Sequence, residues 1–262
     1  MNIEVLLSVM NQSGHAFLEK INLRTDAVIV NQASTEKTEE FTYKQHHIRM
    51  ITMKERGVGL SRNTAFQNSS ADIVLFADQD VEYQDEYDKT ILKEFEKNPK
   101  ADILIFNLKS KNPNNPTYMI SKDKRVRRFN SLRYGATKIA ARRQSLVSSG
   151  VTFSLLFGGG AKYSAGEDSL FLYNCIKKGL RVYACNKQIG TVDQIDSTWF
   201  EGYNDKFFRD KGAFFYYLSP KLAYIYGLQF AIRKRGYKSD EPTVSIYRKI
   251  VAGIKAAKVE QT

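Results

Sequence analysis

Cysteine and histidine are scarce in this sequence, which excludes several kinds of site. Among 262 residues there are two cysteines and three histidines. Cys175 and Cys185 cannot form a disulfide framework, and no cysteine or histidine near them completes a zinc site, so we expect reduced thiols in or near the core. The histidines all precede residue 48, and they form neither a Ser-His-Asp order nor a His-x-x-x-His spacing. A nucleophilic triad and a structural zinc site are therefore unsupported.

Long hydrophobic runs are also missing. No stretch approaches eighteen uncharged apolar residues, so the sequence does not predict a membrane-spanning helix. Residues 1–9 carry Glu4, lack a basic start and have only a short apolar run, so they resemble a first strand more than a signal peptide. We therefore expect a cytoplasmic protein.

Acidic residues are outnumbered by basic ones. The chain has 28 Asp and Glu against 40 Lys and Arg, a net charge of +12. This excess indicates a polyanionic partner, but the charge alone does not choose among nucleic acid, a phosphate-rich substrate and an anionic membrane. The length suits one large α/β domain or a domain with a terminal extension.

Strand and helix patterns alternate through the first half of the chain, which predicts a mostly parallel central sheet flanked by helices. The strands are expected at 3–9, 26–31, 47–53, 72–77, 102–107 and 181–184, and the helices at 14–22, 58–68, 85–97 and 137–148. We expect a nucleotide-binding half at 1–108, an acceptor half at 109–200, and a helical extension at 201–262.

Asp78-Gln79-Asp80 directly follows the apolar run 73–77. A buried strand that ends here would present two carboxylates at the carboxyl edge of the sheet, where α/β proteins bind ligands. Carboxylate oxygens suit Mg²⁺ or Mn²⁺, especially when a diphosphate supplies the other ligands. The alternative is a solvated turn.

A second acidic pair, Glu167-Asp168, follows the glycine-rich segment 158–166 and begins a predicted helix. Acids in a first turn can simply complement the helix dipole. The glycines favour a different interpretation, in which the backbone approaches a bulky substrate and an acid serves as general base.

The segment Gly57-Val58-Gly59-Leu60-Ser61-Arg62 resembles only part of a dinucleotide-binding fingerprint, because Arg62 replaces the third glycine and the segment follows the third predicted strand. A helix N-terminus with an arginine remains a reasonable phosphate contact.

Two further segments are rich in basic or aromatic residues. Between Lys122 and Arg143 there are nine Lys or Arg and one acid, Asp123, which predicts either a solvated basic face or a site for an anionic or lipid-phosphate group. The tail from Trp199 to Arg235 is aromatic with basic flanks, and its stretch 222–235 is a candidate interfacial helix. Core packing is the alternative for these aromatics.

Together, the β/α first half, Arg62-Asn63, Asp78-x-Asp80 and Gly166-Glu167-Asp168 resemble glycosyltransferase family 2 over about residues 1–200. The resemblance implies the GT-A fold and inverting transfer of a sugar from a nucleotide-diphosphate donor to an acceptor hydroxyl. By this similarity Asp80 would hold a divalent metal, Mn²⁺ or Mg²⁺, with Asp78 supporting it or contacting the ribose. Asp168 would be the general base, with Glu167 beside it.

The resemblance also implies a nucleotide pocket formed by Arg62, Asn63 and residues at strand ends, namely Ser8, Asn31 and Gln79. The chain departs from the family pattern in three places. Asn31-Gln32-Ala33-Ser34 stands where Asp-Asp-Gly-Ser is usual, Ser8-Val9-Met10-Asn11 replaces a proline and an aromatic, and no histidine follows His47 to complete the metal site. Two alternatives follow: Asp193 or Asp196 substitutes for that histidine, or the metal is held weakly.

The expected donor is a nucleotide sugar, with a UDP-sugar favoured. The expected acceptor is a glycan on a polyprenyl-diphosphate carrier in bacterial capsule or exopolysaccharide synthesis, at the inner face of the cell membrane. Oligomeric state, homo- or hetero-, stays open. Two alternatives remain: a nucleic-acid-binding protein, which leaves the acidic motifs without a role, or a catalytically inactive partner subunit.

Overall fold

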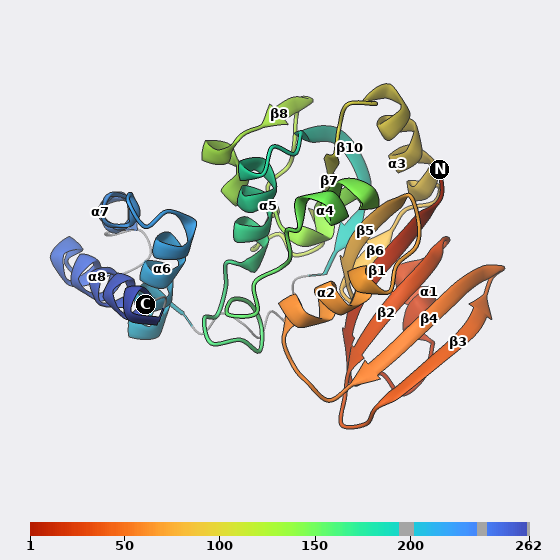
Figure 1. The fold of residues 1–262 in the computed structure, drawn as a ribbon, viewed down its shortest axis with the longest axis horizontal. Helices are drawn as coiled ribbons and strands as arrows, with labels where there is room; N and C mark the ends of the chain where they lie inside the picture. The colour runs from red at the N-terminus through yellow and green to blue at the C-terminus, as the bar shows by residue number, and fades with distance from the viewer. Residues whose placement is uncertain (194–201, 235–239, 261–262) are drawn as a thin grey trace. The chain divides into compact units, whose positions relative to one another are not determined.

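The computed structural model of the protein describes residues 1–193, 202–234 and 240–260 (Figure 1). Its strands are β1 Ile3–Met10, β2 Asp26–Gln32, β3 Lys37–Tyr43, β4 His46–Met53, β5 Ile73–Asp78, β6 Val81–Tyr83, β7 Ile103–Ser110, β8 Lys124–Val126, β9 Ile139–Arg142 and β10 Val182–Val192. Among the described residues they form one mixed sheet in the order β3-β4-β2-β1-β5-β9-β7-β10-β6, and β8 pairs with β10.

Four neighbouring strands of this sheet, β4, β2, β1 and β5, are parallel. Their carboxyl ends therefore lie at the same edge. The register places Ser8 of β1 beside Asp78 of β5 on one side and Val30 of β2 on the other. The predicted apolar run 73–77 is fully buried, and Asp78 is the residue at which β5 reaches the edge.

The helices of the first 193 residues are α1 Phe17–Ile21, α2 Val58–Gln67, α3 Tyr87–Lys97, α4 Arg143–Ser149 and α5 Glu167–Lys177, with two 3-10 segments, η1 Arg128–Arg133 and η2 Ala136–Lys138. They pack on the two faces of the sheet. Successive side chains of a strand point to opposite faces, so β1 places Val5 and Leu7 in one buried cluster and Leu6 in the other.

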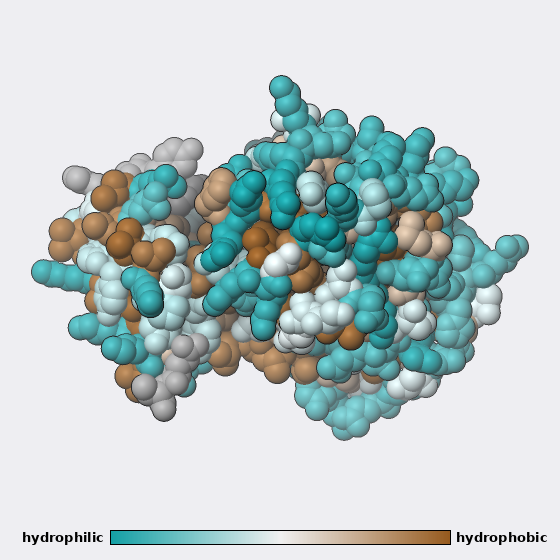
Figure 2. All heavy atoms as spheres, turned by 45° about the horizontal axis from the view of Figure 1, so that its top comes forward, coloured by the Kyte–Doolittle hydropathy of each residue, from teal (hydrophilic) through white to brown (hydrophobic). Residues whose placement is uncertain are grey.

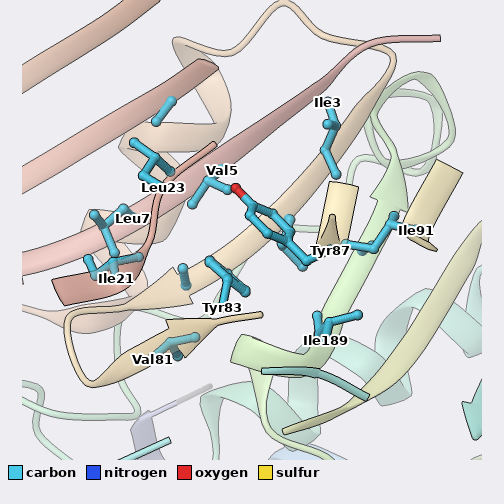
Figure 3. Packing of buried hydrophobic residues seen from close by; sticks show 14 of the residues in the cluster. Ile3, Val5, Leu7, Ile21, Leu23, Val81, Tyr83, Tyr87, Ile91 and Ile189 are labelled. Carbon is cyan, nitrogen blue, oxygen red and sulfur yellow. The ribbon is translucent and has the colours of Figure 1, made fainter. Parts of the chain in front are cut away.

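Tyr87 shows how the first of these clusters is packed (Figure 3). Its ring lies between β1 and Tyr83, with a ring-centroid distance of 4.2 Å to Tyr83. Its hydroxyl lies 3.1 Å from Thr25 Oγ1, so the one polar atom of this buried side chain has a partner. Helix α3 is thus fixed against the sheet directly after the Asp78–Asp80 turn and β6.

The expected fold class is confirmed, while several element predictions are corrected. The helix predicted at 137–148 is instead η2, strand β9 and the short helix α4. Ala140 and Ala141 favour a helix by propensity, but they fill the position between β5 and β7, where small side chains pair antiparallel with both strands. The sequence reading also missed β3, whose polar residues alternate as on an edge strand, and the three-residue β6.

Both cysteines are free and buried, as predicted. Burial raises the pKa of each thiol to about 12. These thiols are therefore unreactive at neutral pH.

The chain divides into two compact units. The first joins residues 1–155 and 167–196, and the second joins residues 156–166 and 197–262. In the second unit lie α6 Asp205–Leu218, α7 Ala223–Lys234 and α8 Thr243–Glu260. The boundary expected near residue 200 falls in 194–201, outside the described residues, as do Trp199, Phe200, Asp196 and Arg235 of the sequence analysis.

Helices α6 and α8 approach each other closely through glycine. A Cβ on Gly212 would lie 2.0 Å from the carbonyl oxygen of Ile250, and one on Gly253 would lie 1.9 Å from that of Arg209. The core of this unit uses part of the aromatic tail, since Phe208, Phe214 and Phe215 are buried. None of the described helices combines the length and apolarity that crossing a bilayer requires.

Candidate active site

Arg62 brings the two predicted acidic motifs together. Its Nη2 atom donates to Asp78 Oδ2 at 2.9 Å and Oδ1 at 3.2 Å. Its Nη1 atom donates to Asp168 Oδ1 at 2.6 Å and to Glu167 Oε1 at 3.3 Å. One guanidinium therefore joins the end of β5 to the first turn of α5, two segments about ninety residues apart in the sequence.

The position of Arg62 is set by α2, which begins after β4 at the same edge of the sheet. The side chain is only 3% exposed, and its guanidinium carbon lies 5.3 Å from the centre of the Phe153 ring. The preceding residue, Ser61, donates from Oγ to Ser8 Oγ at 2.8 Å and so ties α2 to β1. Ser8, a predicted pocket residue, is buried in this contact and lies beside Asp78.

The charges in this cluster do not balance, because one cation faces three carboxylates. Burial by itself lowers the pKa of Arg62, but the charges of Asp78, Asp168 and Glu167 outweigh it and raise the pKa above its usual value. Burial raises the pKa of Asp78, and Arg62 opposes that effect. Arg62 is consequently always protonated, and the cluster keeps excess negative charge when its acids are ionised.

Asp80 adds to this negative charge. Burial, then the charge of Asp78, and more weakly that of Asp193, raise the pKa of Asp80 to about 7. The residues that follow β5 and β10 meet here, since the backbone N–H of Asp193 donates to the Asp80 carbonyl oxygen at 2.8 Å. Asp80 therefore lies where a cation would be stabilised.

The donor set suits a divalent cation only in part. No group of three or more Asp, Glu, His or Cys side chains within the described ranges is arranged to hold a metal, and Asp78 already accepts from Arg62. Asp80 has hard oxygen donors and excess negative charge around it. A metal held by this one side chain would take further ligands from a bound diphosphate and from water, which is the usual way Mg²⁺ is bound.

Two of the predicted pocket residues shape the backbone after β1. Asn31 accepts from the Gln12 N–H at 3.0 Å and donates to the Gln12 carbonyl at 2.9 Å. Gln79 accepts from the Met10 N–H at 3.0 Å. Asn31 is buried and Gln79 is exposed, so any direct contact of this pair with a ligand would come from Gln79.

Gln12 and Gln32 lie at the same edge and were missed in the sequence analysis. Gln12 Nε2 lies 3.3 Å from Gln79 Oε1, and Gln32 Oε1 accepts from the Gly57 N–H at 2.7 Å. Gln32 is the last residue of β2, next to the predicted Asn31, and Gln12 lies two residues after β1, so their position along the chain was the available signal. Phe153, which stacks on Arg62, carried none.

Asn63 and the glycines before it serve packing. Asn63 donates to the Phe153 carbonyl at 2.9 Å and accepts from the Phe153 N–H at 2.8 Å, so its amide holds that segment. Gly57 has a φ of +142°, and a Cβ on Gly59 would lie 2.3 Å from the Ser154 carbonyl oxygen. These contacts explain the partial glycine fingerprint without a dinucleotide.

Asp168 is oriented from two sides. Its Oδ1 accepts from Arg62, and its Oδ2 accepts from the Ala136 N–H at 2.9 Å. The side chain is still 26% exposed, against 13% for Glu167. Of the two acids in this turn, Asp168 is therefore the one a substrate can reach more readily.

A comparison with models of known protein families identifies the family of the chain. The profile described as Glycosyl transferase family 2 matches residues 3–156. This is more than half of the chain, so the protein belongs to glycosyl transferase family 2. No curated protein sequence matches it.

Solved structures with the GT-A fold are similar to most of the chain. A fragment of S. aureus TarS in complex with UDP-GlcNAc has a TM-score of 0.63 and 16% identity, over 83% of this chain and 66% of that one. A longer S. aureus TarS structure has a TM-score of 0.59 and 15% identity, over 98% of this chain and 43% of that one. The mannosyltransferase PcManGT from Pyrobaculum calidifontis, in complex with GDP-Man and Mn2+, has a TM-score of 0.51 and 13% identity, over 98% of this chain and 75% of that one.

At these identities the similarity establishes the fold alone. The chain spans less than two thirds of the first TarS structure and less than half of the longer one.

Replacing Arg62 tests whether charge holds this site together. Arg62→Met removes the cation that three buried or half-buried carboxylates share, so we expect the free energy of unfolding to fall by about 3–5 kcal/mol at pH 8. The loss should be smaller at pH 5, where the carboxylates can take up protons. Urea unfolding at both pH values measures this.

Arg49→Met is the matched control, because it removes a half-exposed arginine paired with Glu40 at 2.8 Å. Its effect should stay below about 1 kcal/mol. An Arg62→Met loss that is the same at both pH values would assign the contribution of Arg62 to packing instead of charge.

Proposed function

We propose that the protein is an inverting, metal-dependent glycosyltransferase that moves a sugar from a nucleotide-diphosphate donor, with a UDP-sugar favoured, to a hydroxyl of a glycan acceptor. The observation that carries the proposal is the shared contact of Arg62 with Asp78 and Asp168. It joins a carboxylate at the donor-binding edge of the sheet to one that is suited to act on an acceptor.

The proposed reaction requires that the acceptor hydroxyl loses its proton and that the negative charge of the leaving diphosphate is neutralised. In the transfer, the acceptor oxygen forms a bond to the anomeric carbon while the bond from that carbon to the diphosphate breaks. Asp168 takes the proton of the acceptor hydroxyl, and Arg62 and the Ala136 N–H hold its carboxylate in place. When bound at Asp80, a divalent cation neutralises the leaving diphosphate.

The donor class is supported by the similar structures. TarS was solved with UDP-GlcNAc and with UDP, and PcManGT with GDP-Man and Mn2+. In this proposal the nucleotide sugar binds at the edge formed by β1, β2 and β5, where the side-chain amides of Gln12 and Gln79 lie.

Asp168→Asn separates acceptor chemistry from donor binding. The substitution keeps the size of the side chain and removes the proton acceptor, so we expect transfer to fall by at least about 100-fold. The shift in melting temperature on adding UDP-sugar and Mn²⁺ should be largely unchanged. Glu167→Gln is the matched control and should retain more activity, since Glu167 is the less exposed of the pair. Loss of donor binding in Asp168→Asn would contradict the assignment.

The raised pKa of Asp80 predicts how metal binding depends on pH. Because the folded-state pKa is about 7 and the unfolded value is about 4, the folded protein binds this proton more tightly, and stability falls as pH rises through that window. A divalent cation competes with the same proton. The apparent affinity for Mn²⁺ should therefore be about tenfold weaker at pH 6 than at pH 8.

Thermal-shift titration with Mn²⁺ and UDP, UDP-sugar, GDP-, dTDP- and CDP-sugars measures both donor class and metal dependence. Asp80→Asn should abolish the Mn²⁺ effect, and without metal it should be more stable than the parent at pH 8. A Mn²⁺ shift that survives in Asp80→Asn would place the metal elsewhere. No shift with any nucleotide would favour the inactive-subunit alternative.

We further propose that the acceptor is lipid-linked, on a polyprenyl-diphosphate carrier in capsule or exopolysaccharide synthesis, and that the protein associates with the inner face of the cell membrane. The support comes from α7, which replaces the interfacial helix expected at 222–235. Tyr224, Ile225, Leu228 and Ile232 are 42–63% exposed on this helix, and hydrophobic side chains are visible on the surface of this unit (Figure 2). Lys221 and Arg233 lie near its two ends.

Ile225→Ser with Ile232→Ser tests this surface. Both side chains are more than half exposed in the isolated chain, so folding should be preserved. Their loss should weaken binding to phosphatidylcholine–phosphatidylglycerol vesicles by about tenfold or more. Val244→Ser with Val259→Ser removes exposed residues of α8 and is the control. Equal vesicle binding by both double variants would contradict the role of α7.

A further inference from the structure

Six cations on one segment of the first unit have no acidic partner among the described residues. We call this set the basic strip, and its members are Lys122, Lys124, Arg125, Arg127, Arg128 and Arg133. Elsewhere many cations pair with carboxylates, as Lys89 does with Glu86 and Lys97 with Glu94. The one acid inside the strip, Asp123, accepts from the Asn186 N–H at 2.7 Å. The strip therefore concentrates positive charge that no ion pair among the described residues neutralises.

Part of the strip is ordered around Tyr118. Lys124 Nζ donates to the Tyr118 hydroxyl at 3.0 Å, and the Arg133 guanidinium lies 5.1 Å from the centre of the same ring. Buried Lys138 holds Tyr118 in turn, since its Nζ donates to the Tyr118 carbonyl at 2.8 Å. Hydrogen bonds from Lys124 and Arg133 lower the pKa of Tyr118. Two cations are thus held in place beside an aromatic ring, which reduces the entropy lost when an anion binds.

The strip continues directly to the proposed general base. η1 carries Arg128 and Arg133, and Ser169 Oγ of α5 lies 3.4 Å from the Leu132 carbonyl oxygen. Three residues after Arg133, the Ala136 N–H donates to Asp168. An acceptor that places a hydroxyl at Asp168 therefore has the strip as its neighbour on this side. The face that carries β8 comes forward in Figure 2, where hydrophilic side chains cover much of it.

We propose that the basic strip binds phosphate groups of the acceptor, so that the acceptor is a phosphate-bearing glycan whose phosphodiester or diphosphate lies close to the reacting hydroxyl. This inference rests on the proposed function. Exposed arginines beside aromatic rings suit phosphate oxygens, because a guanidinium can donate two parallel hydrogen bonds. The proposed function places the donor diphosphate at a different group of residues, around Asp78 and Asp80. The donor diphosphate and the acceptor phosphate are therefore recognised separately.

The test is the triple variant Arg125→Gln, Arg128→Gln, Arg133→Gln, compared with Lys93→Gln, Lys100→Gln, Lys177→Gln. All six side chains are exposed, and the two variants lose the same charge. Fluorescence anisotropy with labelled short-chain inorganic polyphosphate measures binding at physiological ionic strength. The strip variant should bind about 30- to 100-fold more weakly than the parent, since each exposed charge contact contributes roughly three- to fivefold. The control variant should stay within about twofold.

Three further measurements separate the sources of phosphate. The thermal shift with UDP and Mn²⁺ should be unchanged in both variants, which confirms folding. If the parent protein shows no such shift but still binds polyphosphate through the basic strip, the proposed donor is rejected and the role of the strip is kept. Loss of binding to phosphatidylglycerol vesicles alone would assign the strip to lipid headgroups and overturn the proposal. The proposal would also be overturned if a single-stranded oligonucleotide bound to the strip much more tightly than polyphosphate of equal charge. Polyphosphate affinities that agree within about twofold among the parent, the strip variant and the control variant would overturn it as well.

Discussion

The buried guanidinium of Arg62 is the interaction on which the site depends. A carboxylate taken out of water is costly unless a cation or hydrogen bonds compensate it. The sheet edge presents Asp78, and α5 presents Glu167 and Asp168, so the three acids would repel one another at this depth. One arginine with contacts to all three makes the convergence possible. Because the guanidinium must reach that point, α2 has to start close to the strand ends, and Gly59 allows that close packing against Ser154.

The same charges explain why the two sides of the site differ. Around Asp78 and Asp80 the carboxylates outnumber the one buried cation, and the pKa of Asp80 is raised to about 7 as a result of burial and of its acidic neighbours. Around Tyr118 the imbalance is reversed, with cations that lack carboxylate partners in the described part of the chain. The acidic side can bind a cation and the basic side can bind an anion. This combination suits the proposed reaction, in which a metal-bound diphosphate leaves and a second molecule that carries an anion attacks. A protein that only bound nucleic acid would gain nothing from the acidic side.

The sequence predicted the parallel strands and the position of Asp78 well, because burial and strand termination are both written in local patterns. It also placed Glu167 and Asp168 at a helix start. It did not predict that Arg62 would join them, since that contact spans about a hundred residues and depends on where α2 and α5 pack. Instead, Arg62 was assigned to the nucleotide pocket. Strand β9 was not predicted for a related reason. Ala140 and Ala141 have a local helical preference, which pairing between β5 and β7 overrides.

The C-terminal helices have a role that is separate from any membrane contact. The glycine-rich loop 156–166 belongs to their unit, where Asp210 accepts from the backbone N–H and hydroxyl of Ser164 at 3.0 and 2.9 Å. The Tyr163 hydroxyl donates to Glu260 at 2.9 Å. Gly166, with a φ of +133°, is held against Phe214 in the same unit, where a Cβ would lie 2.6 Å from the ring.

Gly166 is therefore required by backbone conformation and packing. This reason differs from the close approach to a substrate that the sequence suggested. The next residue in the chain is Glu167, the first residue of α5. Deleting these helices would disturb the loop and any lipid-binding surface at once. Substitutions confined to the exposed face of α7 disturb only the surface, and they are the changes that separate the two roles.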